Sequence, residues 1–383
     1  MHMISEPLKT QKLTNFKTRD FGKSCSASYM KFEAVTIKDI AKALGLSTST
    51  VSRALRDSYE ISPETKKLVL EYAEKINYHP NPIALSLKER KSRTIGVIVC
   101  EIANSFFSQV INGIESIAYN RGYNVIIAQS HELFDKEVRN LQYLTSRSID
   151  GLIVSVSVET KDFSHFMDVH QKGLPIVFFD RIVNEIETYK VIVDNYKGTY
   201  DAITHLIRNG CRDIGVLAFS EFLSITRERL AGYKAALADN GLAFKEQLVQ
   251  YCKPGANLKD DLEVAVRTLV RLRPAPDAII GLSDKLTTGC LRILKNENIS
   301  VPHDISLIGF SNSEMTDLIT PALSIIKQPA FEMGEISTQL LLQMIESKKP
   351  VSDFVTKILA PELLIHESSD HKRPVKEKLS VGN

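Results

Sequence analysis

A short run of hydroxyl and guanidinium side chains carries the most distinctive chemistry in this sequence. A hydroxyl group both donates and accepts hydrogen bonds, and a guanidinium group donates two parallel bonds in a fixed fork. Such groups are suited to contacting the base edges and phosphates of duplex DNA, provided that they lie on the outer face of a helix. The run comprises Ser47, Thr48, Ser49, Thr50, Ser52 and Arg53.

Two short helices joined by a tight turn are expected to position this run. Residues 35–55 read VTIKDIAKALGLSTSTVSRAL, with apolar residues at helical spacing in both halves. Thr36 and Ser47 are typical helix N-caps, and Gly45 stands where the first helix should end. The apolar residues after Ser47 then face inward, which leaves the hydroxyl groups and Arg53 outside. This pattern predicts a DNA-reading helix-turn-helix, and Thr36 is included among its predicted DNA contacts.

A third helix is predicted immediately afterwards. Ser62-Pro63-Glu64 supplies an N-cap, a proline for the first helical position and an early negative charge. The alternative interpretation is a small helical bundle with no role in nucleic-acid binding, because short capped apolar patterns also arise by chance.

The charge distribution favours the DNA-binding interpretation. Residues 34–93 contain 11 Lys and Arg against 7 Asp and Glu, and residues 1–33 contain 6 against 3. The remaining 290 residues contain 31 against 36, so a chain of net charge +2 has a basic head and a mildly acidic body. This asymmetry is expected when only one end meets phosphate. Because the surplus is modest, two heads are expected to act together.

Residues 77–93, NYHPNPIALSLKERKSR, have the composition of a hinge. Between Pro82 and the basic cluster only about two turns of helix are available, too few to be stable alone in water. Such a segment would order when a DNA groove and a partner hinge complete it. The alternative is a solvated linker between domains.

From residue 94 onward the sequence alternates short β-branched runs with amphipathic stretches. Five runs begin at 94, 124, 151, 175 and 191, and five more at 213, 249, 278, 305 and 324. Runs of this type are buried parallel strands, so two doubly wound α/β lobes are predicted. Ligands on such sheets bind beyond the carboxyl ends of the strands, which places a binding cleft between the lobes.

At this point the sequence resembles the lac repressor (LacI/GalR) family of bacterial transcription regulators over about residues 34–368. The head motif in residues 35–55, the NYHPN stretch, the RLAGY segment and the run from VPHDISLIGF to TPALSIIKQP each resemble family patterns, in the family's order. The resemblance implies a homodimer that binds a pseudo-palindromic operator. It also implies a periplasmic-binding-protein-like core that senses a small molecule, by expectation a sugar or sugar derivative.

The resemblance also implies roles for individual DNA-contacting residues. Thr48, Ser49 and Arg53 match the positions that read bases in the major groove. Arg53 has the chemistry to bond a guanine bidentately, whereas the two hydroxyls offer shorter and more permissive contacts.

In the hinge, Leu87 matches the wedge position, where paired leucines enter the minor groove and kink the central base step. Asn81, Ala84 and Lys88 match their family counterparts and are predicted to contact DNA. Leu85 departs from the polar or basic residue common at its position.

The resemblance assigns an effector pocket to residues at or near the cleft. Two aspartates in this set follow the carboxyl ends of predicted strands, and the arginine matches one that fixes polar effector groups in the family. The set comprises Phe106, Phe107, Asp180, Arg229, Asp284 and Gln328.

Ser311 is the one predicted pocket residue that departs from the family pattern. Many members read G-[YF]-D-[DN] where this chain has Gly309, Phe310, Ser311 and Asn312, and the aspartate is a main effector contact there. The serine removes a carboxylate, so the ligand class does not carry over from relatives, although Asn312 offers a partial replacement.

Two other functional classes share the two-lobed α/β architecture. An enzyme is disfavoured because the sequence lacks GxxxxGK[ST], GxGxxG after a strand, GxSxG and HExxH, and its histidines and five cysteines are scattered; no cofactor or metal is expected. A cytoplasmic or exported sugar-binding protein without regulatory DNA binding is the second alternative. Because no hydrophobic leader and no long apolar run is present, a cytoplasmic location is expected.

The expected organisation follows from these segments. Residues 1–33 are a disordered extension, with Met30 as the expected natural start, and 34–79 form the DNA-binding domain. Residues 80–93 are the hinge helix and linker, 94–368 the two-lobed core for effector binding and dimerisation, and 369–383 a flexible tail.

Overall fold

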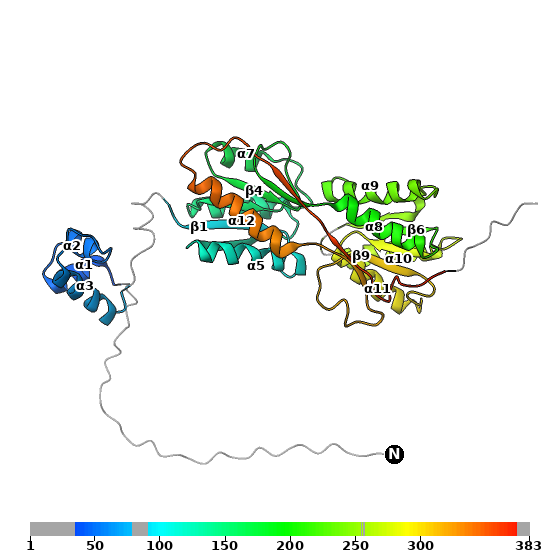
Figure 1. Cartoon of the computed structure of the whole chain (residues 1–383), viewed down its shortest axis with the longest axis horizontal. Helices are drawn as coiled ribbons and strands as arrows, with labels where there is room; N and C mark the ends of the chain where they lie inside the picture. Colours follow the sequence, from blue (N-terminus) through cyan, green and yellow to red (C-terminus); the bar gives the residue numbers. More distant parts are fainter. Residues whose placement is uncertain (1–34, 79–90, 254, 256, 374–383) are drawn as a thin grey trace, which may run out of the picture. The chain divides into compact units, whose positions relative to one another are not determined.

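The computed structural model describes residues 35–78, 91–253, 255 and 257–373 (Figure 1). The chain divides into two compact units between Asn81 and Pro82, and each unit is described by itself. The predictions for the extension before residue 34, including the start at Met30, lie outside the described residues. The same holds for the predicted hinge contacts, Asn81, Ala84, Leu87 and Lys88.

The first unit contains three helices, α1 (Ile37–Leu44), α2 (Thr48–Ala54) and α3 (Pro63–Lys75). Their starts and ends confirm the predicted caps: Gly45 ends α1 with a left-handed backbone at φ 63°, and Ser47 and Ser62 precede α2 and α3. The buried side chains come from all three helices and form one small core: Ile40, Ala41, Val51, Ala54, Val69 and Ala73.

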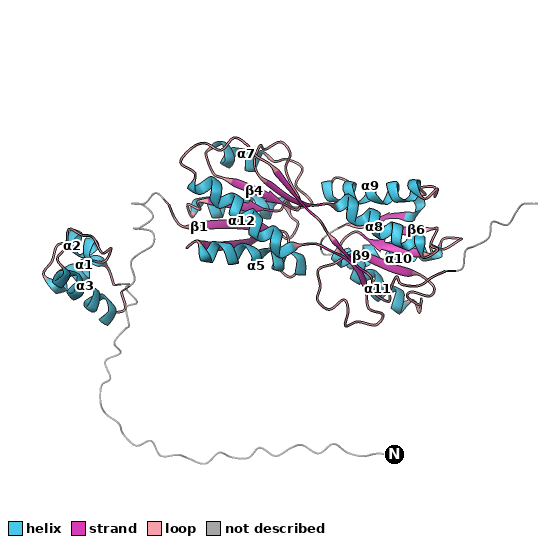
Figure 2. Cartoon of the chain, viewed as in Figure 1, coloured by secondary structure: helices cyan, strands magenta, loops and turns pink. Residues whose placement is uncertain are grey.

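The second unit contains two six-stranded sheets (Figure 2). The first has the order β11-β5-β4-β3-β1-β2 and the second the order β12-β10-β9-β8-β6-β7. All pairs are parallel except β10 with β12. The strands are β1 (Thr94–Val99), β2 (Asn124–Gln129), β3 (Gly151–Val154), β4 (Ile176–Phe179), β5 (Lys190–Val193), β6 (Ile214–Ala218), β7 (Val249–Tyr251), β8 (Ala278–Gly281), β9 (Ser306–Phe310), β10 (Ser324–Lys327), β11 (Thr356–Leu359) and β12 (Glu362–Leu364).

Helices cover both sheets and define two lobes, confirming the predicted two-lobed α/β core. Lobe 1 consists of β1 to β5 and β11 with α5 (Ser105–Asn120), α6 (Phe134–Ser146), α7 (Ser164–Gln171) and α12 (Ala330–Glu346). Lobe 2 consists of β6 to β10 and β12 with α8 (Asn195–Arg208), α9 (Ser224–Asp239), α10 (Leu258–Arg271), α11 (Asp284–Asn296) and a 3-10 turn, Glu246–Leu248. No helix within the described ranges is long and apolar enough to cross a membrane.

The chain passes between the lobes three times, after β5, after β10 and between β11 and β12. The sequence predicted ten strands and missed β11 and β12. The reason is physical: β11 is an edge strand whose residues are mostly exposed, so it lacks the apolar run that marks a buried strand. Because these two strands join opposite sheets, the C-terminal segment ties the lobes together.

The ordered chain extends further than predicted at its C-terminal end. A flexible tail was expected from Ser369, yet Ser369 is fully buried and its hydroxyl donates to that of Ser324 over 2.7 Å. Arg373 donates to the carbonyl oxygens of Pro302 and Asp304 at 2.9 and 3.0 Å. The first five residues of the predicted tail therefore belong to lobe 2; charge and composition concealed these long-range contacts.

Two glycines bring the backbones of α5 and α12 into direct contact. A Cβ atom on Gly113 of α5 would overlap the carbonyl oxygen of Phe331, and one on Gly334 of α12 would overlap that of Val110. In lobe 2, Gly232 of α9 similarly faces the backbone of Tyr196 in α8. These positions are restricted to glycine by the close approach of the partner helix.

Gly113→Ala is expected to destabilise the second unit by about 1–3 kcal/mol or more, because the added methyl group meets backbone atoms that cannot rotate away. Urea unfolding of the full chain measures this effect. Glu115→Ala, at an exposed position of the same helix, is the control and is expected to change little. Equal stability of the two variants would show that the helices separate without cost.

Candidate functional site

The predicted DNA-contacting hydroxyls lie on the surface of the first unit. Thr36, Ser47, Thr48 and Ser49 are exposed, and Thr50 and Ser52 are half-buried. Thr36 also has a local role, because its hydroxyl and its backbone N–H donate to the Asp39 carboxylate at 2.7 and 2.8 Å. The hydroxyl bond lowers the pKa of Asp39 and stabilises the charged carboxylate at the start of α1.

Within α2 the polar side chains bond one another at the helix start. The Ser47 hydroxyl accepts from the backbone N–H of Thr50 at 3.0 Å and lies 2.7 and 2.8 Å from the hydroxyls of Ser49 and Thr50. Arg53 is exposed and pairs with Glu60 at 3.0 Å. An exposed ion pair of this kind contributes little, so its guanidinium is free to exchange Glu60 for another acceptor.

A second polar site lies between the lobes. One cavity of about 60 Å³ is lined by all seven residues predicted for effector binding, drawn from both lobes. Lobe 1 contributes the start of α5 and the residue after β4; lobe 2 contributes α9, the start of α11 and the residue after β9, and one lining residue lies in the crossing after β10. The seven are Phe106, Phe107, Asp180, Arg229, Asp284, Ser311 and Gln328.

The cavity is also lined by six residues that the sequence analysis did not predict for effector binding. Two of them could have been predicted from the sequence, because Arg181 directly follows Asp180 and Asn104 is the N-cap of α5. Asn312 had been named as a partial replacement for the carboxylate lost at Ser311, and the other three are apolar or short polar residues without a distinctive local pattern. The six are Asn104, Arg181, Ile225, Ser283, Phe310 and Asn312.

Arg229 is held rigidly in lobe 2. Its Nε donates to the Asn195 side-chain oxygen at 2.8 Å and its Nη1 to the Leu282 carbonyl at 2.6 Å, and the guanidinium carbon lies 3.6 Å from the centre of the Phe310 ring. Only 3% of Arg229 is exposed, and burial lowers its pKa to about 10. A desolvated cation that lacks a direct carboxylate bond gains from a polar ligand more than an exposed one does.

Asp180 combines burial with an unusual backbone. It directly follows β4 and has φ 57°, a left-handed conformation that non-glycine residues seldom adopt. Burial raises its pKa above the ordinary value, partly offset by the nearby guanidinium groups of Arg181 and Arg229. The strain and the buried carboxyl group both mark this position as one maintained for a function rather than for stability.

Ser311 and Asp284 form a hydrogen-bonded pair in lobe 2. The Ser311 hydroxyl donates to the Asp284 carboxylate, and burial raises the pKa of Asp284. Asp284 begins α11 immediately after its N-cap Ser283. The serine therefore occupies one oxygen of the aspartate beside it, which reduces the acceptor capacity left for a ligand.

Gln328 offers a free donor. Gln328 is 7% exposed, and its Nε2 makes no hydrogen bond of normal geometry within the described residues. The side-chain amide nevertheless lies near enough to Asp180 to lower the pKa of the Asp180 carboxyl group. An unmatched buried amide is costly, so this nitrogen is available to an acceptor group of a ligand.

Several contacts hold the two lobes against each other around the cavity. Asn312 donates to the side-chain oxygen of Gln109 at 2.9 Å and to the Gln328 carbonyl at 2.7 Å, and Gln109 donates back to the Asn312 carbonyl at 3.0 Å. Lys285 of α11 forms an ion pair with Glu101, which follows β1. The small cavity volume is a consequence of this closure.

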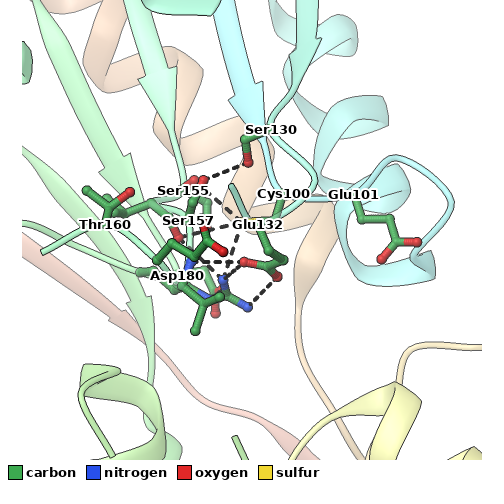
Figure 3. A network of polar contacts seen from close by, with 12 residues as sticks. Cys100, Glu101, Ser130, Glu132, Ser155, Ser157, Thr160 and Asp180 are labelled. Atoms are coloured by element: carbon green, nitrogen blue, oxygen red, sulfur yellow. Dashed lines mark hydrogen bonds and ion pairs between the residues drawn. The ribbon is translucent and has the colours of Figure 1, made fainter. Parts of the chain in front are cut away.

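On the lobe 1 side, a polar network lies at the carboxyl ends of the strands (Figure 3). Arg181 donates to both Glu132 carboxylate oxygens, at 2.5 and 3.1 Å, and Glu132 also accepts from the backbone N–H of Val158 at 3.0 Å. Glu137 accepts from Ser157 and Thr160 beside it, at 2.6 and 2.7 Å. The bonds of Arg181 fix the segment that carries it and Asp180, and those of Glu137 fix the loop after β3.

The cavity is smaller than the pockets of about 300–1,000 Å³ that hold small molecules. A ligand of sugar size therefore enters only when the lobes move apart or the lining side chains rearrange. The described residues contain no cluster of three or more His, Cys, Asp or Glu side chains placed to hold a metal ion.

Two family profiles match the chain. One, described as bacterial regulatory proteins of the lacI family, matches residues 36–81. The other, described as periplasmic binding proteins and sugar binding domain of the LacI family, matches residues 92–365. Together they span the helix-turn-helix and the two-lobed core.

Individual relatives match this chain over most of its length. The transcriptional repressor PurR of Vibrio campbellii is 32% identical over 315 residues, covering 82% of this chain and 93% of that protein. A complex of the transcriptional regulator CelR with cellobiose is 27% identical, with a TM-score of 0.64 over 87% of this chain and 99% of that chain. The lac repressor dimer bound to operator and an anti-inducer, at 23% identity, TM-score 0.74 and coverage of 88% and 99%, has a similar fold.

Asp180→Asn is expected to stabilise the protein at neutral pH. Because burial raises the pKa of Asp180, its contribution to stability is full below about pH 4 and is lost as the pH rises through the raised value. An asparagine carries no charge to bury and tolerates the left-handed backbone.

Urea unfolding between pH 4 and pH 7 measures this effect, with Asp353→Asn, at an exposed position, as control. The advantage of Asp180→Asn over the wild type should grow as the pH rises. An advantage that is absent or independent of pH would contradict the assignment.

Proposed function

Because this chain belongs to the LacI family of bacterial regulatory proteins, we propose that it is a sequence-specific transcription repressor whose affinity for operator DNA is controlled by a small molecule. One observation carries the proposal: seven predicted pocket residues from distant parts of the sequence line a single cavity between two lobes, in a chain whose head exposes a recognition helix. We propose accordingly that the chain is not an enzyme and acts in the cytoplasm, where DNA is accessible.

On the DNA side, we assign base reading to the exposed face of α2. Arg53 bonds a guanine in place of Glu60, and Thr48 and Ser49 make short contacts. The remaining hydroxyls and Thr36 contact the phosphate backbone. One such head offers few contacts, so two copies on a homodimer bind two half-sites, and the operator is pseudo-palindromic. The residues proposed for the minor groove are Asn81, Ala84, Leu87 and Lys88.

On the effector side, the chemistry of the cleft suits a polyhydroxylated ligand. Arg229 and Gln328 supply donors, Asp180 and Asp284 supply acceptors, and aromatic rings supply apolar walls. A sugar hydroxyl both donates and accepts, so it matches a mixed set of this kind. The likeness to the CelR–cellobiose complex supports a sugar or sugar derivative. Because Ser311 stands where many family members carry an aspartate, the identity of the sugar does not carry over from those members.

Effector and operator are coupled through the lobes. Binding in the cleft requires the lobes to rearrange, and this changes the presentation of the heads to DNA. Such coupling is typically worth about 1–3 kcal/mol and is reciprocal, so operator DNA must change effector affinity by the same factor.

Arg53→Ala is expected to weaken binding to the specific operator by about 1–3 kcal/mol while leaving binding to random duplex nearly unchanged. The operator is first identified by genomic footprinting of the wild-type protein, and gel shift then measures both affinities. Lys67→Ala, at an exposed position of α3, is the control. Equal losses on specific and random DNA would mean that Arg53 contacts phosphate only.

Gln328→Leu is expected to weaken effector binding up to about tenfold, because the leucine fills the same space without the free donor. A thermal-shift panel of sugars and sugar phosphates identifies the compound to be titrated, and calorimetry measures its affinity. Gln171→Leu, at an exposed position of α7, should bind that compound as the wild type does. An unchanged affinity of Gln328→Leu would remove this residue from the pocket.

A further inference from the structure

Asp150 anchors the segment through which the DNA-binding unit joins the core. Its Oδ1 accepts from the backbone N–H and the hydroxyl of Ser92 at 2.7 and 3.0 Å, and its Oδ2 accepts from the backbone N–H of Arg93 at 2.9 Å. Ser92 and Arg93 are the last residues of the predicted linker and immediately precede β1, and Lys91 is the first linker residue that the structure describes. One carboxylate therefore holds three donors at this junction.

Two helices connect the junction with the cleft. α5 begins with Phe106 and Phe107 in the cavity lining, and α12 begins two residues after Gln328. α12 has 17 residues and is therefore about 25 Å long. The glycine contacts described above pack α5 and α12 backbone against backbone, which leaves little room for one helix to shift without the other.

The far ends of this helix pair lie at the junction. Arg121, which caps α5, forms an ion pair with Glu346 at the end of α12. Lys91 donates to the carbonyl oxygen of Ile345, also in the last turn of α12, at 3.4 Å. The last three residues of the predicted linker are thus bonded both to Asp150 and to the helix that starts at the cleft.

Lobe 2 contains a carboxylate in a similar position, Asp277, but the linker does not enter beside it. Asp277 accepts from the backbone N–H groups of Arg212 and Asp213 at 2.9 and 3.1 Å, just before β6, as Asp150 does just before β1. The chain that enters this second site comes from α8 of the same lobe. Both carboxylates accept from two successive backbone N–H groups just before a strand, and the two sites differ in the segment that precedes them.

We propose that Asp150 is a positioning residue that couples the effector cleft to the DNA-binding unit, by fixing residues 92–93 to lobe 1 where the helix pair α5–α12 ends. The inference rests on the proposed function of the protein. Loss of the carboxylate releases the junction from lobe 1, so movement at either end no longer reaches the other. Asp277 holds the segment between α8 and β6 within lobe 2 and serves as the comparison site.

Hydrogen–deuterium exchange of the full chain tests the proposal, with the duplex selected by the wild-type protein from a random library as probe. Because coupling is reciprocal, the duplex should slow exchange in residues 103–112 and 328–336 of the wild type by about fivefold or more. In Asp150→Ala the duplex should slow exchange in residues 35–78 only. In Asp277→Ala the wild-type pattern should persist, although both variants lose a carboxylate that holds backbone donors.

The outcomes separate this inference from the proposed function. Slowed exchange near the cleft in Asp150→Ala, or loss of the response in both variants alike, would overturn the role of Asp150 while leaving a DNA-binding regulator. A wild type that selects no duplex would overturn both. Asp150→Asn, which keeps one acceptor oxygen, is measured in parallel and should show a partial loss, so the test holds even if Asp150→Ala fails to fold.

Discussion

The three passages of the chain between the lobes are the constraint on which the rest of the second unit depends. They bring the carboxyl ends of two parallel sheets face to face, which is where such sheets place ligand contacts. They also make each lobe from discontinuous segments: α12 and β11, from the C-terminal part of the chain, complete lobe 1, and β12 returns to lobe 2. Movement of one lobe against the other must therefore be absorbed at a few crossing points, one of which carries Gln328.

The cleft is an energetically costly part of this fold. It places Asp180, Asp284 and Arg229 in a poorly solvated space. Burial there raises the pKa of each aspartate and lowers that of the arginine, so it favours the neutral form of all three. Its donors are only partly matched by acceptors within the protein, and Asp180 has a strained backbone besides. A site of this kind becomes favourable when a ligand supplies the missing partners, which gives a physical basis for coupling between ligand and conformation.

The first unit is held together differently from the second, because its small core comes from local contacts among three short helices. Its polar residues serve two purposes at once: Thr36 and Ser47 cap helices, while their neighbours remain exposed. The described pairing of Arg53 with Glu60 keeps the guanidinium on the surface at little cost. The proposed DNA-contacting face therefore lies on a unit whose core forms without the cleft.

The sequence by itself determined the local features. The caps Ser47 and Ser62, the end of α1 at Gly45 and ten of the strands could be predicted because each depends on residues close together in the chain. The resemblance supplied the seven pocket residues, most of which lie at strand ends or helix starts, where such a fold places a cleft. Only the tertiary structure decided which distant segments meet: the edge strands β11 and β12, the burial of Ser369, the bond between Ser311 and Asp284, and the clamp of Asp150 on Ser92 and Arg93. These features arise from contacts between residues far apart in the chain, and no local pattern of apolar or capping residues records them.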